Sequence, residues 1–172
     1  MTDLRAWQLA FLKQARADWE TYQRIDDPTW PTCHRLHFLQ MASEKLGKAL
    51  LAGGDMPLER ITHTHAAFVK FIRIARKNHN LQKELGMNYS QITAHFNRLL
   101  PIAHEIEMLA PTLAHDGPNP EYPWFDNSGH ILVPIDYSFP LMKRLHFPPG
   151  TQLLKYIGNF ITDFEKLFLR RQ

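Results

Sequence analysis

This chain of 172 residues lacks the features that define several large classes of protein. Its one cysteine, Cys33, excludes an internal disulfide and is typical of a reducing compartment. No run of about 18 apolar residues is present, so no segment is predicted to cross a membrane. The N-terminus is amphipathic, carries Asp3, and has neither the continuous apolar region nor the cleavage site of a signal peptide. We therefore expect a cytoplasmic protein that has no membrane contact.

Motifs for common catalytic and phosphate-binding sites are also missing. The chain has no G-x-x-x-x-G-K-[ST] loop, no G-x-G-x-x-G turn and no G-x-S-x-G elbow. Among its ten histidines, neither His34 with His37 nor His63 with His65 has metal-ligand spacing and a carboxylate or cysteine partner. We therefore predict no metal site and no cofactor. Cys33 is not predicted to be a nucleophile, because His34 points elsewhere on a helix.

The net charge is small. Twenty lysines and arginines against 17 carboxylates give +3 at pH 7, and the two signs appear mixed along the chain. This balance permits nucleic-acid binding without arguing for it. Hydrophobic residues make up 44% and charged residues 22%, as in globular proteins, and we predict a single domain over residues 1–172.

Apolar residues recur at three- and four-residue intervals along most of the chain, which predicts helices. The first helix is predicted over residues 4–25. Asp18 falls on its apolar stripe, so we expect this carboxylate at the edge of the stripe beside a lysine or arginine. The inward stripe is predicted to contain Leu4, Trp7, Phe11, Ala15 and Tyr22.

A second helix over residues 34–51 is expected to organise the fold. Thr32 is predicted to cap its start, and the glycine pair at 53–54 to end it in the left-handed conformation. Lys45 and Lys48 lie among apolar residues of this helix. We expect their stems to pack and their charges to reach water, with an anion-binding or partner-binding face as the alternative.

Two further helices are predicted before residue 111. One covers residues 64–77, after a loop, and has His65 as a hydrogen-bonded histidine at its entrance. The other has the most regular spacing and is predicted to pack against another helix, within the chain or in a second copy. Pro101 should kink it or divide it. Its apolar seam consists of Tyr89, Ile92, Phe96, Leu99, Ala103, Ile106 and Ala110.

Residues 111–149 are rich in proline and aromatic residues and predict a long ordered loop. A short strand is predicted at residues 131–133, and Trp124 is expected to be buried against the helices. A last helix is predicted over residues 151–169. The expected fold is all-α: an up-and-down helical bundle of four to five helices with a long loop before the last one.

Several phrases, taken in order, resemble the HEPN domain family, small helical proteins of prokaryotic nucleotide and RNA biology. Residues 15–18 read A-R-A-D, residues 40–51 read Q-M-A-S-E-K-L-G-K-A-L-L, and residues 62–65 read T-H-T-H. In that family an A-x-x-D helix precedes a Q-x-A-x-E-K-x-x-K-A helix and a histidine near the start of the third. The similarity covers roughly residues 5–75. A weaker echo at 121–123, E-Y-P, has glutamate where many members have arginine.

The resemblance implies a helical bundle that is often a homodimer. Some members of the family bind nucleotides or RNA, or partner minimal nucleotidyltransferases. The leading expectation is such a module, binding nucleotide, RNA or a protein, in a toxin–antitoxin or defence setting. Its predicted ligand-binding residues are His37, Lys45, Lys48, His65 and Tyr122.

Many other HEPN members are metal-independent ribonucleases with an R-x(4–6)-H motif, and this is the alternative. The arginine would stabilise phosphate charge and the histidine would transfer a proton. Three stretches fit, starting at Arg60, Arg73 and Arg98, and the predicted catalytic pair is Arg98 and His104. On a straight helix these two side chains would lie on different faces, and the kink leaves their geometry open. A third possibility is a scaffold whose proline-rich segment docks a larger complex.

Overall fold

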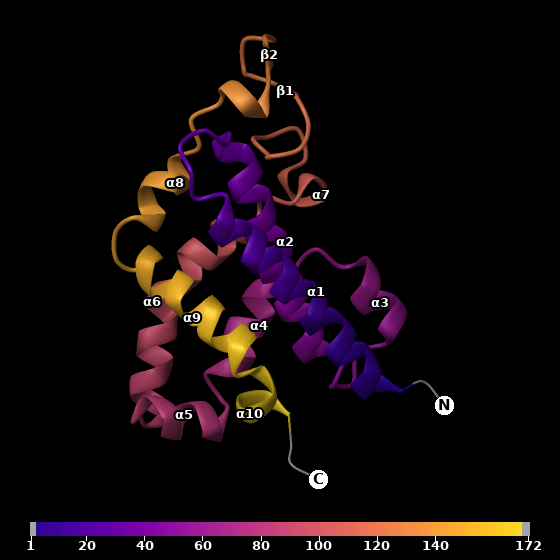
Figure 1. The fold of residues 1–172 in the computed structure, drawn as a ribbon, viewed down its shortest axis with the longest axis vertical. Helices are drawn as coiled ribbons and strands as arrows, with labels where there is room; N and C mark the ends of the chain where they lie inside the picture. The colour runs from indigo at the N-terminus through magenta and orange to yellow at the C-terminus, as the bar shows by residue number, and fades with distance from the viewer. Residues whose placement is uncertain (1–2, 170–172) are drawn as a thin grey trace.

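The computed structural model describes residues 3–169, and these residues are mostly helical (Figure 1). This confirms the all-α prediction. Four long helices carry most of the core: α1 (Leu4–Arg24), α2 (Thr32–Leu51), α6 (Tyr89–Glu107) and α9 (Gly150–Thr162). Shorter helices raise the number of α-helices in the described part to ten, above the expected four to five. They are α3 (Leu58–His63), α4 (Phe68–Ala75), α5 (His79–Leu85), α7 (Pro111–Ala114), α8 (Pro140–Leu145) and α10 (Phe164–Phe168).

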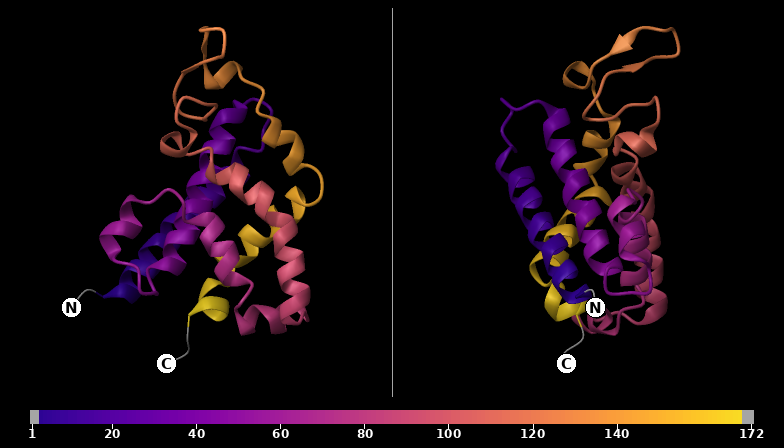
Figure 2. Two further views of the ribbon diagram at one scale, coloured as in Figure 1. Left: turned by 180° about the vertical axis from the view of Figure 1, so that it is seen from behind. Right: turned by 90° about the vertical axis from the view of Figure 1, so that its right-hand side faces the viewer.

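Helix α2 is the central element. It packs against α1, α4, α6 and α9, and its residues Leu36, Leu39, Ala42, Leu46 and Ala49 are fully buried. The right-hand view of Figure 2 shows α1 and α2 side by side, with α4 and α6 on the opposite edge. This arrangement leaves one long side of α4 and α6 facing outward.

The buried stripe of α1 differs from the predicted one at the N-terminal end. Leu4 and Trp7 are exposed, whereas Ala15 and Tyr22 are buried as expected. The stripe that faces α2 consists of Gln8, Leu12, Ala15, Asp18 and Tyr22. Asp18 can lie in it because a lysine of α2 neutralises its charge, as described below.

Helix α2 ends at Leu51 as predicted, but both of its predicted caps are wrong. Thr32 is already helical, Pro31 occupies the N-cap position, and no side chain caps this end. At the other end Ala52 is right-handed, and neither glycine of the pair at 53–54 has a positive φ. The helix ends because the chain turns there, and a left-handed glycine is not involved.

Residues 58–86 are divided into more elements than predicted. Part of the expected loop forms α3, the expected helix over 64–77 is the shorter α4, and α5 occupies a predicted link. Asn78 caps α5 by accepting a hydrogen bond from the Leu81 amide, and Gly86 ends it with φ of 61°. Helix α5 thus depends on local caps at both ends, which replace a long apolar stripe.

The predicted seam of α6 is confirmed from Ile92 onward, since Phe96 and Leu99 are fully buried, but Tyr89 is exposed. The capping box of Asn88 and Gln91 fixes the start of the helix. Pro101 lies within the continuous helix, on its exposed side. The left-hand view of Figure 2 shows α6 changing direction in its second half, as a proline kink predicts.

The segment after α7 forms a small lobe at one end of the molecule (Figure 1). It contains the antiparallel strands β1 (Trp124–Phe125) and β2 (Ile131–Leu132) and the 3-10 helix η1 (Pro134–Asp136). Burial of Trp124 is confirmed, and so is the short strand, which stops before Val133. The predicted last helix is two helices, because the chain breaks at Asp163 between α9 and α10.

None of the helices formed by residues 3–169 is both long and apolar enough to cross a membrane.

Candidate functional site

Basic side chains are concentrated in one stretch of the chain. Residues 60–104 contain seven lysines and arginines and a single carboxylate, Glu84, which gives this stretch a net charge of +6. Basic and acidic residues were expected to be mixed along the whole chain, and for this stretch that expectation is wrong. The seven are Arg60, Lys70, Arg73, Arg76, Lys77, Lys83 and Arg98.

Helix α4 and the turn after it carry three of these side chains. The buried face of the helix is formed by Phe68, Phe71, Ile72 and Ala75. Because an α-helix has 3.6 residues per turn, Lys70 and Arg73 share the opposite side, and the exposed Lys77 follows in the turn after the helix. The strong apolar face of α4 therefore produces a basic ridge on its outer side.

Two contacts tie α4 to α6 in antiparallel register. At one end the Arg76 guanidinium donates to the Asn97 side-chain oxygen at 2.9 Å. At the other end the Val69 amide donates to the Glu107 carboxylate at 3.0 Å. Arg73 on α4 and the stretch from Arg98 to His104 on α6 lie between these ties. We call the outer side of α4, α5 and α6 the basic face.

The basic charges of this stretch are not neutralised by carboxylates of the described residues. The ten ion pairs found among residues 3–169 include none of the seven lysines and arginines of residues 60–104. Glu84, the one carboxylate of this stretch, is paired with Lys166 of α10 at 2.7 Å. Lysines and arginines elsewhere in the chain, such as Arg5 and Arg35, do have carboxylate partners. Such a surface can bind an anion without first breaking an internal ion pair.

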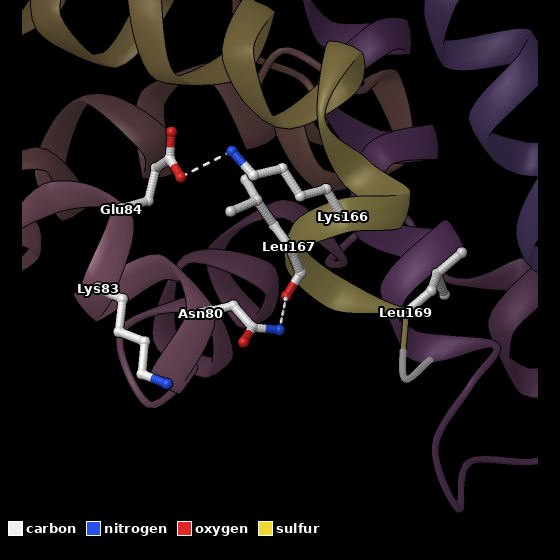
Figure 3. A pocket seen from close by; sticks show the side chains of 6 residues that line it. All are labelled: Asn80, Lys83, Glu84, Lys166, Leu167 and Leu169. Atoms are coloured by element: carbon white, nitrogen blue, oxygen red, sulfur yellow. Dashed lines mark hydrogen bonds and ion pairs between the residues drawn. The ribbon is translucent and has the colours of Figure 1, made fainter. Parts of the chain in front are cut away.

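A shallow hollow between α5 and α10 lies at the end of this face (Figure 3). Asn80 donates to the Leu167 carbonyl at 3.3 Å, which holds the two helices together. Figure 3 shows Lys166 reaching Glu84, while the Lys83 side chain extends away from both. Lys83 lines the hollow, and its exposed ammonium group, which is not paired with Glu84, adds to the basic face.

The predicted catalytic residues Arg98 and His104 have different neighbours. The Arg98 guanidinium approaches His95 Nδ1 at 3.5 Å, and His95 Nε2 is 2.8 Å from the Tyr156 hydroxyl of α9. Burial and the nearby Arg98 charge lower the pKa of His95, so this ring is neutral at pH 7. The Arg98 side chain thus belongs to the side of α6 that meets α9.

His104 is exposed and lines a groove of about 310 Å³ at the C-terminal end of α6. The groove walls include Met108, Tyr137, Phe139 and Leu141, so it opens toward α8 and the lobe. Arg98 and His104 thus have separate surroundings, Arg98 beside His95 and Tyr156 and His104 in the groove toward the lobe.

Lys45 and Lys48, two of the predicted ligand-binding residues, have structural partners. Lys45 Nζ is 2.7 Å from Asp18 of α1, and Lys48 Nζ is 2.7 Å from Glu44. Lys48 also donates to the Thr62 carbonyl at 3.0 Å. The expectation that both charges reach water is wrong, because Lys48 is only 6% exposed and both lysines compensate buried carboxylates.

His65 also binds Glu44, through Nδ1 at 3.0 Å. It is hydrogen-bonded as expected, but it lies in the loop before α4 and not on a helix. The residues that carry the HEPN resemblance thus connect α1, α2 and the α3–α4 segment. Their observed contacts give these residues a structural role in the fold.

The remaining predicted ligand-binding residues, His37 and Tyr122, do not form one site. His37 contacts Glu121, the residue before Tyr122. His37 Nδ1 is 3.3 Å from the Glu121 carboxylate without hydrogen-bond geometry, and Tyr122 is 60% exposed on the lobe. Within residues 3–169, no group of three histidine, cysteine, aspartate or glutamate side chains is arranged to hold a metal ion.

The net charge of the whole chain does not reveal the basic face, because it sums over segments of opposite sign. The net charge of shorter segments does reveal it, because the 45 residues from 60 to 104 contain a single carboxylate, Glu84. Most of these basic side chains are close in sequence, on α4, in the turn after it and on α5.

No protein-family model, curated protein or solved structure matches this chain. The HEPN resemblance, the homodimer and the nucleotidyltransferase partner therefore stay predictions.

Proposed function

We propose that this chain is an RNA-binding helical module that holds a phosphate backbone on the basic face. The observation that supports the proposal is a group of basic side chains along α4, the turn after it and α5, none of them ion-paired among residues 3–169: Lys70, Arg73, Lys77 and Lys83. Phosphate contacts by lysine and arginine supply most of the affinity of non-specific nucleic-acid binding. The choice of RNA over DNA rests on the HEPN resemblance.

Exposed side chains between the charges suit RNA better than a simple anion. Tyr89 is 52% exposed at the start of α6, and His79 and His104 are exposed on α5 and α6. Rings of this kind can stack on unpaired bases, which is how single-stranded RNA is commonly recognised. We therefore propose single-stranded RNA as the ligand.

The test is a salt titration of binding to a labelled single-stranded RNA, followed by fluorescence anisotropy. Replacement of Lys70, Arg73 and Lys77 by alanine removes the α4 ridge. We expect at least ~10-fold weaker binding at low salt, and a slope of log K against log[salt] that is about 2 smaller in magnitude.

A matched control removes three exposed lysines outside the basic face, Lys13, Lys143 and Lys155. Its net charge equals that of the ridge variant, so a purely global charge effect would weaken binding equally in both. Equal losses, or no binding by the wild type at low salt, would refute the proposed site.

A ribonuclease is the second candidate, because two of the three arginine–histidine matches consist of exposed residues on α4, α5 and α6. They are Arg73 with His79 and Arg98 with His104. A metal-free cleavage assay separates the two functions. Cleavage that is lost in both Arg98→Ala and His104→Ala would make the chain an RNase, and binding without cleavage favours the module.

A further inference from the structure

The lobe formed by residues 115–139 has the opposite charge to the basic face. It contains Asp116, Glu121, Asp126 and Asp136 and no lysine or arginine, so its net charge is −4. Figure 1 shows the lobe at one end of the longest axis and α5 at the other end. The molecule is therefore electrostatically polar along its length.

The lobe also carries strongly exposed hydrophobic side chains. The four most exposed large hydrophobic side chains among residues 3–169 all belong to it, each at 60% or more. Exposed apolar groups gathered in one place mark an interaction site in many proteins. These residues are Tyr122, Phe125, Ile131 and Ile135.

The hairpin holds two of these side chains in a fixed arrangement. Phe125 and Ile131 are cross-strand partners, and the neighbouring pair is Trp124 with Leu132. Successive residues of a strand face opposite sides, so Trp124 anchors the hairpin while Phe125 and Ile131 face solvent. The Trp124 ring is packed against Tyr137 and Phe139, with centroids 5.0 Å and 6.4 Å away.

The turn of the hairpin is also fixed. Asp126 Oδ1 accepts from the Ser128 and His130 amides at 2.8 Å and 2.9 Å, and Gly129 has φ of 81°. Because the exposed pair is already ordered, little conformational entropy is lost when a partner covers it.

Charge decides which partner fits the lobe. Its carboxylates repel phosphate, so a nucleic acid is a poor occupant. A protein surface that carries unpaired cations beside apolar groups is complementary to the lobe. The chain itself presents one: the basic face has a net charge of +6 over residues 60–104, with Ile74 and Tyr89 exposed on it.

We propose that the lobe of one copy docks on the basic face of another copy. The contact is head-to-tail, because the two surfaces differ and lie toward opposite ends of the molecule. It uses protein groups alone and so does not depend on RNA binding. The apolar area of four side chains is small, so the association is expected to be weak and concentration-dependent.

The experiment is sedimentation velocity on nuclease-treated protein over a concentration series at low salt. We expect the weight-average mass to rise with concentration and to return to the monomer value at high salt, because the contact pairs opposite charges. A wild type that stays monomeric at the highest concentration overturns the proposal.

Two variants make the test specific. The lobe variant Phe125→Thr/Ile131→Thr keeps β-forming residues but removes the exposed pair. The face variant Arg73→Glu/Lys77→Glu reverses charge on the outer side of α4. Each variant alone is expected to be monomeric, with the far-UV circular dichroism of the wild type as the check on folding.

Mixing the variants distinguishes a head-to-tail contact from a symmetric one. The mixture contains one intact lobe and one intact face, so it should form a dimer of twice the monomer mass and nothing larger. Association retained by either variant alone, or a mixture that stays monomeric, contradicts the proposal. Neither result bears on RNA binding, which is measured separately on monomeric protein.

Discussion

Glu44 is a buried carboxylate held by three side chains, and it shows what the conspicuous phrase of α2 does. It is 7% exposed and contacts Gln40, Lys48 and His65. Burial alone would raise its pKa, but the hydrogen bonds from Lys48 and His65 outweigh that effect and the pKa is lowered. The carboxylate is therefore charged when folded, and its partners are part of the fold.

Lys48→Ala is expected to lower the free energy of unfolding by about 3 kcal/mol, because it leaves the Glu44 carboxylate buried with fewer partners. The measurement is urea denaturation at pH 7. The control is Lys13→Ala, on an exposed position of α1, which should change stability by less than ~0.5 kcal/mol. Similar small losses in both variants would show that Lys48 is dispensable.

The stability difference between the wild type and Lys48→Ala should also depend on pH. A carboxylate with a lowered folded pKa contributes stability above its unfolded pKa, about 4.3 for glutamate, and loses it as pH falls through the folded pKa. Protonation of Glu44 removes the charge that Lys48 compensates. The difference in stability between wild type and Lys48→Ala should therefore narrow as pH falls below about 4.

At the scale of elements, the contact between α2 and the segment before α4 depends on a close backbone approach. A Cβ at Gly47 would lie 2.5 Å from the Ala67 carbonyl oxygen and 2.6 Å from its carbon. Backbone atoms cannot move aside as the end of a flexible side chain can. The crossing of α2 by this segment therefore requires glycine at position 47.

Gly47→Ala is expected to destabilise the fold by about 1–3 kcal/mol, despite the better helix propensity of alanine. Gly158→Ala in α9 is the matched control, because the nearest atom to its Cβ is on the Trp19 side chain at 3.2 Å. That variant should be close to neutral in urea denaturation. Equal stability of the two variants would mean that the α2 crossing is looser than described.

The elements that could be predicted from the sequence are those long enough to show a period. Phe96 and Leu99 reveal the buried side of α6 because the helix repeats its spacing over five turns. Helix α5 has seven residues and shows no such pattern, so Asn78 and Gly86 are its only local signals. Asp18 was placed with a basic partner correctly, yet only the folded contact identifies Lys45.

At the scale of the whole molecule, a net charge of +3 hides two opposite surfaces. The basic face comes from residues 60–104 and the acidic lobe from residues 115–139. Each is visible in the sequence as a window of one sign. Their placement toward opposite ends depends on how α6 connects them, and amino-acid composition does not predict that placement. The basic face is the proposed binding surface both for RNA and for the lobe of a second copy.

Because both proposed ligands use the basic face, RNA and self-association should exclude one another. Adding a single-stranded RNA to associated wild-type protein is expected to return the mass per protein to that of a monomer bound to RNA. By linkage, association must weaken RNA binding by the same factor, so the apparent RNA affinity should fall as protein concentration rises. The lobe variant Phe125→Thr/Ile131→Thr leaves the basic face intact, so its affinity should match that of dilute wild type and stay constant. Simultaneous binding, seen as RNA-bound protein that still forms higher-mass species in proportion to its concentration, would show that the lobe docks elsewhere.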